Sequence, residues 1–369
     1  MKRSSYSRYL VPGVAVLALT LSACGAGNED EGNGGLSDDQ ASDAAELSGT
    51  LNGAGASTQE AVMGVWRGNF QSAASDVTVN YDPAGSGAGR EQFIAGGVQF
   101  AGSDAYLDEE ELTAATERCN GTTPIEIPSY VAPIAVAYNL PGVEDLQLSG
   151  ETVAQIFNNQ ITNWNDPAIA ADNPDATLPD LAINPVFRGD ASGTTENFTT
   201  YLDATTSWPH GPVEDWPATG EAATGTSGVI EVVSGTEGSI GYADGSQVEE
   251  AGLSAAAIGV GEEFVAPTPE AAGQILTAST PVPGRDAEVD LAVDIDYTTQ
   301  ESGTYPIVLA SYLIACQSYE DSNEAELVKG FLEYILSPEG QESGTNDAGA
   351  APLPDELREK AAAAVEKIS

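Results

Sequence analysis

The feature that most constrains the fold of this 369-residue chain is one kind of unit that occurs three times. In each unit, a short run with strand character is followed by a turn of small residues and then by the start of an amphipathic helix. Strands that alternate with helices are typical of α/β layers, so the sequence predicts an α/β fold. The runs and their turns are Glu46–Leu51 with Gly53–Thr58, Val77–Tyr81 with Asp82–Gly89, and Leu181–Phe187 with Arg188–Thr194.

Further stretches have the periodicity of helices. The clearest is Asn323–Leu336, where four large apolar residues share one face and Ser337-Pro338 ends the pattern. The chain is long enough for two lobes. The other predicted helices are Gly150–Phe157, Thr194–Leu202, Gly228–Ser234, Pro269–Ser279 and Glu356–Ile368.

The turn Arg188–Thr194 carries the strongest indication of function. Its sequence, Arg-Gly-Asp-Ala-Ser-Gly-Thr, places one guanidinium, one carboxylate and two hydroxyls before a predicted helix. The first N–H groups of a helix have no partner within it, and the helix dipole favours negative charge there. Because a guanidinium fork also suits tetrahedral oxyanions, the segment predicts an anion site. The alternative is that Arg188 and Asp190 form a surface pair around an ordinary helix cap.

The other two turns offer hydroxyl donors in the same setting. Ser57 and Thr58 stand at the start of one predicted helix, and Ser86 lies among glycines before Arg90, which opens the next. Asp104 ends a short apolar run, where its carboxylate is able to point into a cleft. Taken singly, each turn is also explained as a capped loop, and Asp104 as the cap of the helix predicted after it.

Taken together, these segments resemble the phosphate-binding proteins of high-affinity phosphate ABC transporters, a family of substrate-binding lipoproteins. The resemblance runs from about Leu47 to about Pro354, and it is specific because several motifs occur in one order. The motifs are Gly53–Thr58, Gly85–Gly89, Ala101–Ala105, Ile134–Asn139, Ile156–Trp164, Asp166–Ala170, Arg188–Thr194 and Gly238–Tyr242.

The resemblance implies a set of residues that contact phosphate. This chain departs from the family pattern in two places. The family has Thr and then Phe after Gly-Ala-Gly-Ala, where this chain has Ser57 and Thr58, and only Ser86 keeps a side-chain donor in the second loop. The implied contacts are Ser57, Thr58, Ser86, Asp104, Arg188, Ser192, Gly193 and Thr194.

The role expected of Asp104 is to separate phosphate from sulfate. An ionised carboxylate only accepts hydrogen bonds, so Asp104 needs a proton on the ligand. Phosphate carries one or two protons near neutral pH, whereas sulfate carries none and would face the carboxylate without a proton between them. A buried acceptor of this kind discriminates strongly between ions of the same shape. Arg188 would supply the main positive charge, with Asp190 as its partner.

The resemblance also implies an architecture and partners. The expected fold is the two-lobe, periplasmic-binding-protein-like (type II) α/β fold, with two hinge crossovers and a ligand cleft between the lobes. Residues 47–133 and 297–369 would form lobe I, and residues 134–296 lobe II. The implied function is to bind inorganic phosphate outside the cytoplasmic membrane, as a monomer without cofactor or catalysis. The bound ion would pass to the permease and ATPase subunits of an ABC importer.

Other functions stay open as alternatives. A phosphatase-like enzyme would need a base or metals near Ser192, and the single histidine, His210, lies between proline and glycine in a predicted loop. The sequence contains no hydrolase elbow, Walker A lysine or zinc-protease motif. A binding protein for sulfate or molybdate would share the fold. An adhesin with an incidental anion site would have no use for both Asp104 and Arg188.

The charge of the chain excludes one class of partner. With 12 Lys and Arg against 57 Asp and Glu, the formal net charge is -45. A surface of this sign repels nucleic acid, so no nucleic-acid partner is expected. It also repels free phosphate at long range, so capture would depend on local dipoles and Arg188 rather than on steering.

The N-terminus predicts export and a lipid anchor. Three cations precede the apolar run 10–21, which is too short to span a bilayer comfortably. Leu-Ser-Ala-Cys at 21–24 has the pattern of a bacterial lipobox, so residues 1–23 are the predicted signal peptide and Cys24 the lipid-bearing residue. Residues 24–46, rich in Gly, Asp and Asn, are predicted to form a flexible tether. An ordinary secretory leader with an incidental cysteine is the alternative.

The two remaining cysteines, Cys119 and Cys316, predict one disulfide, because disulfides are common in exported proteins. Each lies next to a predicted strand, over 125–138 and 305–315, and a bridge would tie the two strands together. Two free buried thiols are the alternative. No grouping of Cys and His in the sequence has the spacing of a zinc site.

Overall fold

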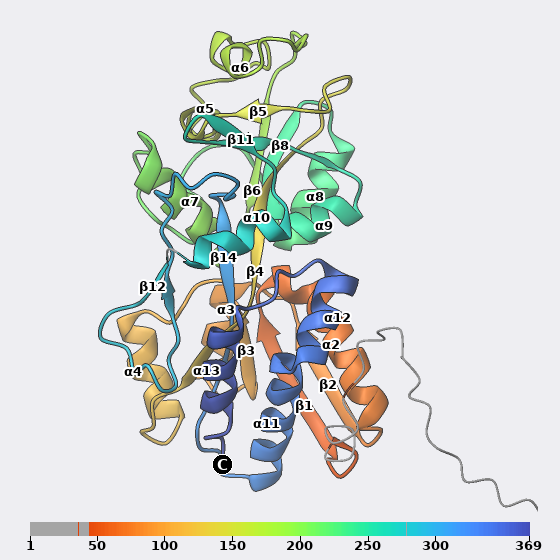
Figure 1. Ribbon diagram of the computed structural model, residues 1–369, viewed down its shortest axis with the longest axis vertical. Helices are drawn as coiled ribbons and strands as arrows, with labels where there is room; N and C mark the ends of the chain where they lie inside the picture. Colours follow the sequence, from red (N-terminus) through yellow and green to blue (C-terminus); the bar gives the residue numbers. More distant parts are fainter. Residues whose placement is uncertain (1–35, 37–43, 278) are drawn as a thin grey trace, which may run out of the picture. The chain divides into compact units, whose positions relative to one another are not determined.

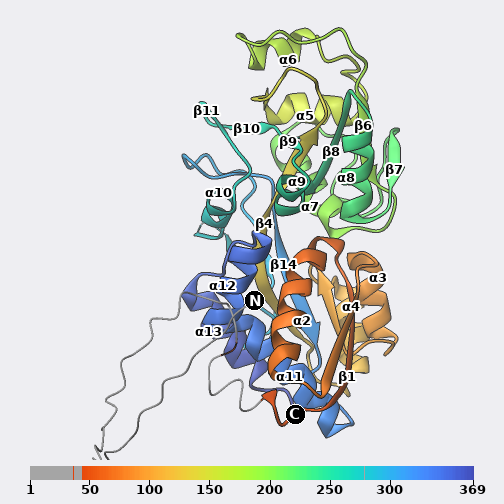
Figure 2. The ribbon, with the colours of Figure 1, turned by 90° about the vertical axis from the view of Figure 1, so that its right-hand side faces the viewer.

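The computed structural model describes residues 36, 44–277 and 279–369 (Figures 1 and 2). The predicted signal peptide, Cys24 and most of the predicted tether lie outside the described residues. At the end of that predicted tether, Ala44 is buried in the core and Leu36 packs against it. The folded part therefore includes residues that the sequence assigned to the tether.

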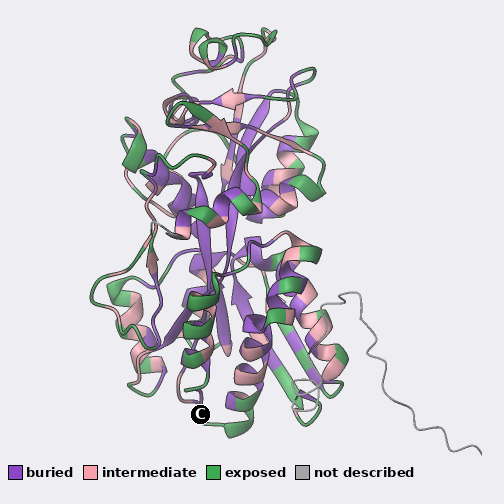
Figure 3. Cartoon of the chain, viewed as in Figure 1, coloured by how far each residue is buried: buried purple, intermediate pink, exposed green. Residues whose placement is uncertain are grey.

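One nine-stranded sheet organises the fold, and its central strand is β4 (Ile125–Tyr138). This strand and its neighbour β14 (Val308–Ala315) are buried along their whole length, and both are purple in Figure 3. The strand order is β2-β1-β3-β14-β4-β8-β6-β7, with β9 also paired to β4. The remaining strands of this sheet are β1 (Gly49–Gly55), β2 (Val77–Asp82), β3 (Phe100–Ser103), β6 (Asn184–Arg188), β7 (Glu221–Ala223), β8 (Ser239–Asp244) and β9 (Ser254–Ala255).

The long strand β4 divides this sheet into two halves. Its residues 125–133 pair with β14, and residues 134–138 pair with β8 instead. In the first half, β1 runs parallel to β2 and β3, and in the second half β6 runs parallel to β7 and β8. The chain segments that sequence analysis singled out follow the carboxyl ends of β1, β2, β3 and β6. Such ends are where ligands bind in open α/β sheets.

Helices pack on both halves of the sheet (Figure 1). On the first half, α2 contacts β2, α11 contacts β1, and α3 contacts both β1 and β3. On the second half, α8 contacts β6 and β8, and α9 contacts β4 and β8. The helices of the first half are α2 (Glu60–Ala73), α3 (Ser86–Ile94), α4 (Glu109–Arg118), α11 (Ser322–Leu336), α12 (Pro338–Ala348) and α13 (Asp355–Val365). Those of the second half are α5 (Gly150–Phe157), α6 (Pro167–Asp172), α7 (Gly193–Thr205), α8 (Gly225–Gly235), α9 (Gly245–Glu250) and α10 (Pro269–Gly273).

The remaining elements are short. A three-stranded sheet has the order β11-β10-β5, and β12 pairs with β13. Two 3₁₀ turns precede α2 and follow α10. Their bounds are β5 (Gln147–Leu148), β10 (Ala257–Val260), β11 (Glu263–Val265), β12 (Thr280–Pro281), β13 (Val293–Asp294), η1 (Ser57–Gln59) and η2 (Gln274–Thr277).

The first glycine-rich segment differs from its prediction. Strand β1 continues through Gly53 and Gly55, which the sequence placed in a turn. A Cβ on Gly55 would lie 1.9 Å from the carbonyl oxygen of Gly102 on β3, and its φ of 150° also favours glycine. These glycines therefore let strands β1 and β3 approach closely. A run of small residues in the sequence does not distinguish this role from a turn.

The second glycine-rich segment differs as well. Helix α3 begins at Ser86, so Gly89 and Arg90, predicted as the turn's end and the helix start, lie inside the helix. A Cβ on Gly89 would lie 2.4 Å from the Cα of Gly55, so small residues allow the helix to sit directly on β1.

The ends of other predicted helices also shift. The stretch predicted over 269–279 is the short helix α10 followed by η2. Helix α12 was not predicted, because Ser337-Pro338 was interpreted only as the end of α11. In the structure Ser337 caps α12 and Pro338 is its first residue, a position that proline favours.

Residues 282–293 depart from the predicted division into lobes. They were assigned to lobe II, yet they contact the first half of the sheet. Glu126 N–H donates to the Val289 carbonyl at 2.9 Å, and Leu291 N–H to the Glu126 carbonyl at 2.8 Å. Arg285 lies 3.0 Å from Asp290 and 3.7 Å from Glu126. Because two buried carboxylates share this arginine, the segment is fixed on the first half of the sheet. The chain therefore returns to the first half earlier in the sequence than the predicted boundary at 296/297.

Cys119 and Cys316 form a disulfide with an S–S distance of 2.01 Å. Cys119 ends α4 and Cys316 directly follows β14, so the bond joins a helix to a strand rather than two strands. Within the described residues, no helix combines the length and apolar character needed to cross a membrane.

Candidate oxyanion-binding site

Asp104 lies at the centre of a buried cluster of hydroxyl groups, just after β3. Its exposed fraction is 2%. The carboxylate accepts hydrogen bonds from Thr58 Oγ1 at 2.8 Å to each oxygen, from Ser311 Oγ at 2.8 Å and from Thr194 Oγ1 at 3.1 Å. Burial raises the pKa of Asp104 above its usual value, and the three hydroxyls and the charge of Arg188 oppose that rise.

Arg188 ends β6 and is 3% exposed. Its Nε donates to Asp190 Oδ1 at 2.9 Å, and its Nη2 donates to the other oxygen of the same carboxylate. Asp190 also accepts from Gly225 N–H at 3.0 Å. Burial alone would raise the pKa of Asp190, but the hydrogen bond and charge of Arg188 lower it below its usual value. Asp190 is therefore ionised at neutral pH and fixes the orientation of the guanidinium.

Thr194 connects these two groups. Its hydroxyl donates to Asp104 and lies 3.5 Å from Arg188 Nη1. It belongs to the first turn of α7, whose cap Ser192 accepts from Thr195 N–H at 3.3 Å. The N–H groups of this turn have no preceding carbonyl within the helix. They add donors and the positive end of a dipole next to the guanidinium.

Gly193 explains how the helix reaches the carboxylate. A Cβ at this position would lie 2.9 Å from Asp104 Cβ and 2.8 Å from Ala105 N. Only a residue without a side chain allows the amino end of α7, from the second half of the sheet, to approach Asp104 on the first half.

The two remaining predicted residues are Ser57 and Ser86. Both are buried: Ser57 lies just after β1, and Ser86 is the first residue of α3. Ser86 Oγ accepts from Asp104 N–H at 3.1 Å. Ser57 Oγ accepts from Thr226 N–H at 3.0 Å and lies 3.0 Å from Thr226 Oγ1. Thr226 follows Gly225, which donates to Asp190. The eight predicted residues are thus linked by one chain of contacts around Asp104 and Arg188.

Sequence analysis missed Ser311 and Thr226. Ser311 is a hydroxyl in the buried strand β14, and Gln59 Nε2 donates to it at 2.8 Å, which leaves its own proton for Asp104. A polar residue inside an apolar run needs a partner, and that was the available signal. Thr226 lies in Thr-Gly-Thr-Ser-Gly at 224–228, a further small-residue segment that forms the start of helix α8.

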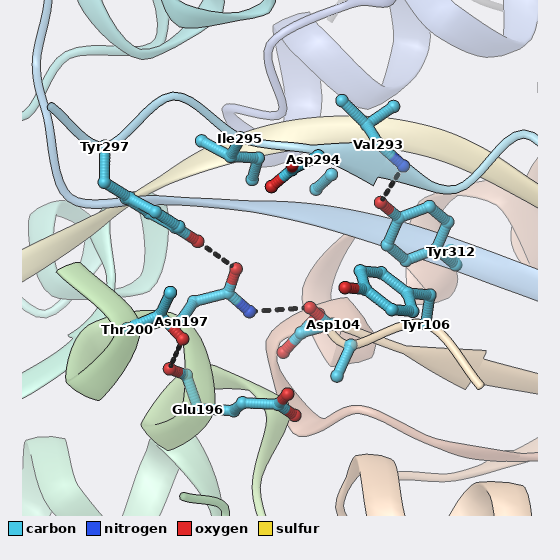
Figure 4. A pocket seen from close by; sticks show the side chains of 12 residues that line it. Asp104, Tyr106, Glu196, Asn197, Thr200, Val293, Asp294, Ile295, Tyr297 and Tyr312 are labelled. Carbon is cyan, nitrogen blue, oxygen red and sulfur yellow. Dashed lines mark hydrogen bonds between the residues drawn. The ribbon is translucent and has the colours of Figure 1, made fainter. Parts of the chain in front are cut away.

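A cavity of about 80 Å³ lies beside this cluster, and Figure 4 shows the residues that line it. Of the predicted site residues, only Asp104 lines it. Asn197 Nδ2 donates to the Asp104 carbonyl at 2.7 Å, and the Tyr297 hydroxyl donates to Asn197 Oδ1 at 2.5 Å. Burial and the charge of Glu214 raise the pKa of Glu196, which also lines the cavity, to about 7. The cavity is therefore lined by Asp104 but not by Arg188.

His210 is exposed, with its ring 4.9 Å from that of Trp208 and its Nε2 3.1 Å from Asn158 Oδ1. In the part of the chain that the structure describes, no group of three His, Cys, Asp or Glu side chains is placed to hold a metal ion. The site contains one guanidinium, helix N–H groups and several hydroxyls around one buried acceptor. This set suits an oxyanion that carries a proton.

Comparison with known proteins agrees with this chemistry. Residues 40–339 match a family model described as a PBP superfamily domain. Phosphate-binding protein PstS 3 of Mycobacterium tuberculosis (strain ATCC 25618 / H37Rv) is 40% identical over 364 residues, which cover 96% of this chain and 97% of that protein. Phosphate-binding protein PstS of Pasteurella multocida (strain Pm70) is 31% identical, with 84% and 88% covered.

Two solved structures share the fold. A high-affinity periplasmic phosphate-binding protein (PfluDING) with bound phosphate gives a TM-score of 0.66 at 22% identity, covering 84% of this chain and 92% of that one. A putative phosphate ABC transporter substrate-binding protein from Clostridium perfringens, also with bound phosphate, gives 0.60 at 20% identity, covering 83% and 100%. The predicted two-lobe, periplasmic-binding-protein-like α/β fold is confirmed. On these matches, the chain belongs to the PBP superfamily and, within it, to the family of PstS phosphate-binding proteins.

Proposed function

We propose that this protein binds inorganic phosphate outside the cytoplasmic membrane and delivers it to an ABC importer. The observation that carries the proposal is the environment of Asp104: a buried carboxylate whose donors are hydroxyls, close to a fixed guanidinium. The two relatives described above match this chain over most of its length and are named as phosphate-binding proteins, which supports the same ligand here.

The geometry explains why a protonated ion fits. A carboxylate has about four acceptor positions. Thr58, Ser311 and Thr194 bring three hydroxyl protons to them, because the single proton of Thr58 is shared between both oxygens. One further proton, that of a P–OH group, can therefore be accepted. Arg188, the amino end of α7 and the hydroxyls of Ser57 and Ser86 would meet the remaining oxygens. Sulfate has no proton to offer, so its oxygens would be repelled by the unpaired acceptor.

We propose that the two halves of the sheet are the two lobes, which close over the ion. The predicted division at 133/134 matches the point where β4 changes partner from β14 to β8. Contacts that join the halves, such as Thr194 with Asp104 and Ser57 with Thr226, surround the site. Residues 282–293 are added to lobe I, because they pack on its strands. Lobe I is then 47–133, 282–293 and 297–369, and the rest of 134–296 is lobe II.

We further propose that the protein is exported through the signal peptide at 1–23 and anchored by a lipid on Cys24. The Cys119–Cys316 disulfide supports an oxidising compartment outside the cytoplasm, and a related structure is described as periplasmic. The partners would be the permease and ATPase subunits of the importer, with the binding protein acting as a monomer without cofactor or catalysis.

Calorimetric titration of the purified, ligand-stripped protein, with Cys24 replaced by serine, tests the proposal. Phosphate should bind tightly at one site per chain, and sulfate should give no binding heat at the same pH and salt. Equal binding of sulfate or molybdate would favour a general oxyanion-binding protein. Release of phosphate from a monoester such as p-nitrophenyl phosphate would favour the phosphatase-like alternative.

A further inference from the structure

Arg90 and Glu214 form an ion pair between the two lobes, beside the candidate phosphate site. Arg90 Nη2 lies 2.9 Å from Glu214 Oε1. The arginine belongs to α3 of lobe I, and the glutamate to the segment between α7 and β7 of lobe II. Their side chains are 5% and 22% exposed, so water screens this pair only partly.

Arg90 is held on lobe I by groups that do not depend on lobe II. Its Nε donates to the two oxygens of Glu111 at 2.9 and 3.0 Å, and its Nη1 donates to Ser103 Oγ at 3.0 Å. Ser103 directly precedes Asp104. One guanidinium edge is therefore fixed on the residue that precedes Asp104, while Nη2 faces the other lobe.

Glu214 is held on lobe II through its backbone. Its carbonyl accepts from Ser192 N–H at 3.3 Å, and the adjacent Val213 N–H donates to Thr199 Oγ1 at 3.0 Å. Two residues further on, Trp216 stacks on Phe187 with 5.6 Å between ring centres. The backbone that carries this carboxylate is therefore fixed beside the amino end of α7, which is the other wall of the site.

The charges make this contact specific to the closed arrangement. Burial would lower the pKa of Arg90, but the charges of Glu214 and Glu111 outweigh it, so the guanidinium remains charged. If the lobes separated, Arg90 would keep Glu111 as its partner. Glu214 would lose Arg90, its only ion-pair partner among the described residues. The Arg90 side chain, which Glu111 and Ser103 fix beforehand on lobe I, loses little rotational freedom when the two lobes meet.

We propose that the Arg90–Glu214 pair is an affinity-determining contact that stabilises the closed lobes and slows the release of phosphate. These are positioning residues, since neither is placed to touch the ion. The inference rests on the proposed function, because it assumes that the ligand is held by closure of these two lobes.

The test compares Glu214→Gln with the matched variant Glu111→Gln, which removes a charge from the same arginine within lobe I. For Glu214→Gln, the phosphate Kd should rise about tenfold, mostly through faster dissociation in stopped-flow measurements. The thermal midpoint of its ligand-free form should stay at the wild-type value. For Glu111→Gln, the phosphate Kd should stay within about twofold of wild type. The ratio of phosphate to sulfate affinity should not change in either variant.

A Glu214→Gln variant with an unchanged dissociation rate, or one whose ligand-free thermal midpoint falls instead, would overturn the inference while phosphate binding itself stands. A wild-type protein that binds no phosphate would overturn the proposed function. The inference would then fall as well, since it assumes a ligand that is held by closure of the two lobes.

Discussion

Asp104 and Asp190 lie in the same site, but their surroundings differ in the kind of donor. Asp104 accepts from three neutral hydroxyls, whereas Asp190 accepts from the Arg188 guanidinium and a backbone N–H. The pKa of Asp104 is raised, chiefly by burial, and that of Asp190 is lowered by Arg188 despite burial. One carboxylate is therefore able to respond to a proton on the ligand, and the other serves to orient a cation.

The largest effect is expected from Arg188→Met, which removes the cation and leaves Asp190 without its partner. Removing one partner of a buried, hydrogen-bonded charge pair between protein and ligand costs about 4 kcal/mol of binding free energy, which corresponds to about a thousandfold weaker phosphate binding. Calorimetry with phosphate measures this loss. A change of less than tenfold would mean that helix N–H groups and hydroxyls, rather than the guanidinium, provide most of the binding energy.

Asp104→Asn should alter the choice of ion more than the strength of binding. An amide both accepts and donates, so it removes the repulsion of sulfate and weakens the match to P–OH. We expect phosphate affinity to fall about tenfold while sulfate affinity rises, so that their ratio drops at least about a hundredfold. Paired titrations with both ions at pH 7 give this ratio.

Ser311→Ala is the control for that comparison. It removes one hydroxyl from Asp104 but keeps the carboxylate, so phosphate affinity should fall a few-fold with the ratio unchanged. If Ser311→Ala lowers the ratio as much as Asp104→Asn does, selectivity depends on the geometry of the cluster and not on the missing proton of sulfate.

A smaller effect is expected from Asp190→Asn. This change loosens the guanidinium, yet it also removes a negative charge near the bound anion, and the two effects oppose each other. The phosphate Kd should change less than about fivefold, and the ratio of phosphate to sulfate affinity should stay at the wild-type value. Loss of selectivity in this variant would remove the distinction between the two aspartates.

The sequence was sufficient to single out these two carboxylates because each lies within a short motif. Arg188, Asp190 and Thr194 are neighbours in the chain, and their spacing alone indicates an anion site. Ser311 and Thr226 could not be recognised in this way. They come to the site from elements more than 100 residues away from their partners Asp104 and Ser57, and only strand pairing and helix packing bring them there.

The α/β class was also predictable, since alternating strands and helices leave a local pattern. The position of residues 282–293 has a different origin: a buried Arg285 shared by Glu126 and Asp290 holds this segment on the first half of the sheet. Such an ion pair links positions that no local periodicity connects. The glycines of β1 were misplaced for a related reason, because the contact that requires them lies on a neighbouring strand.

The smallest expected effect is a difference in how the two aspartates respond to acid. The pKa of Asp104 is raised from its ordinary value of 3.8, so its contribution to stability is fully present below that value and is lost as the pH rises through the folded-state pKa. The pKa of Asp190 is lowered from the same value, so its contribution is present above 3.8 and is lost as the pH falls through the folded-state pKa. Urea unfolding of the ligand-free wild type, Asp104→Asn and Asp190→Asn between pH 7 and pH 3 measures both. On acidification, wild type should gain stability relative to Asp104→Asn and lose stability relative to Asp190→Asn. If both differences in unfolding free energy changed with pH in the same direction, the two carboxylates would be in equivalent states despite their different donors. That result would contradict the separate roles proposed for Asp104 and Asp190.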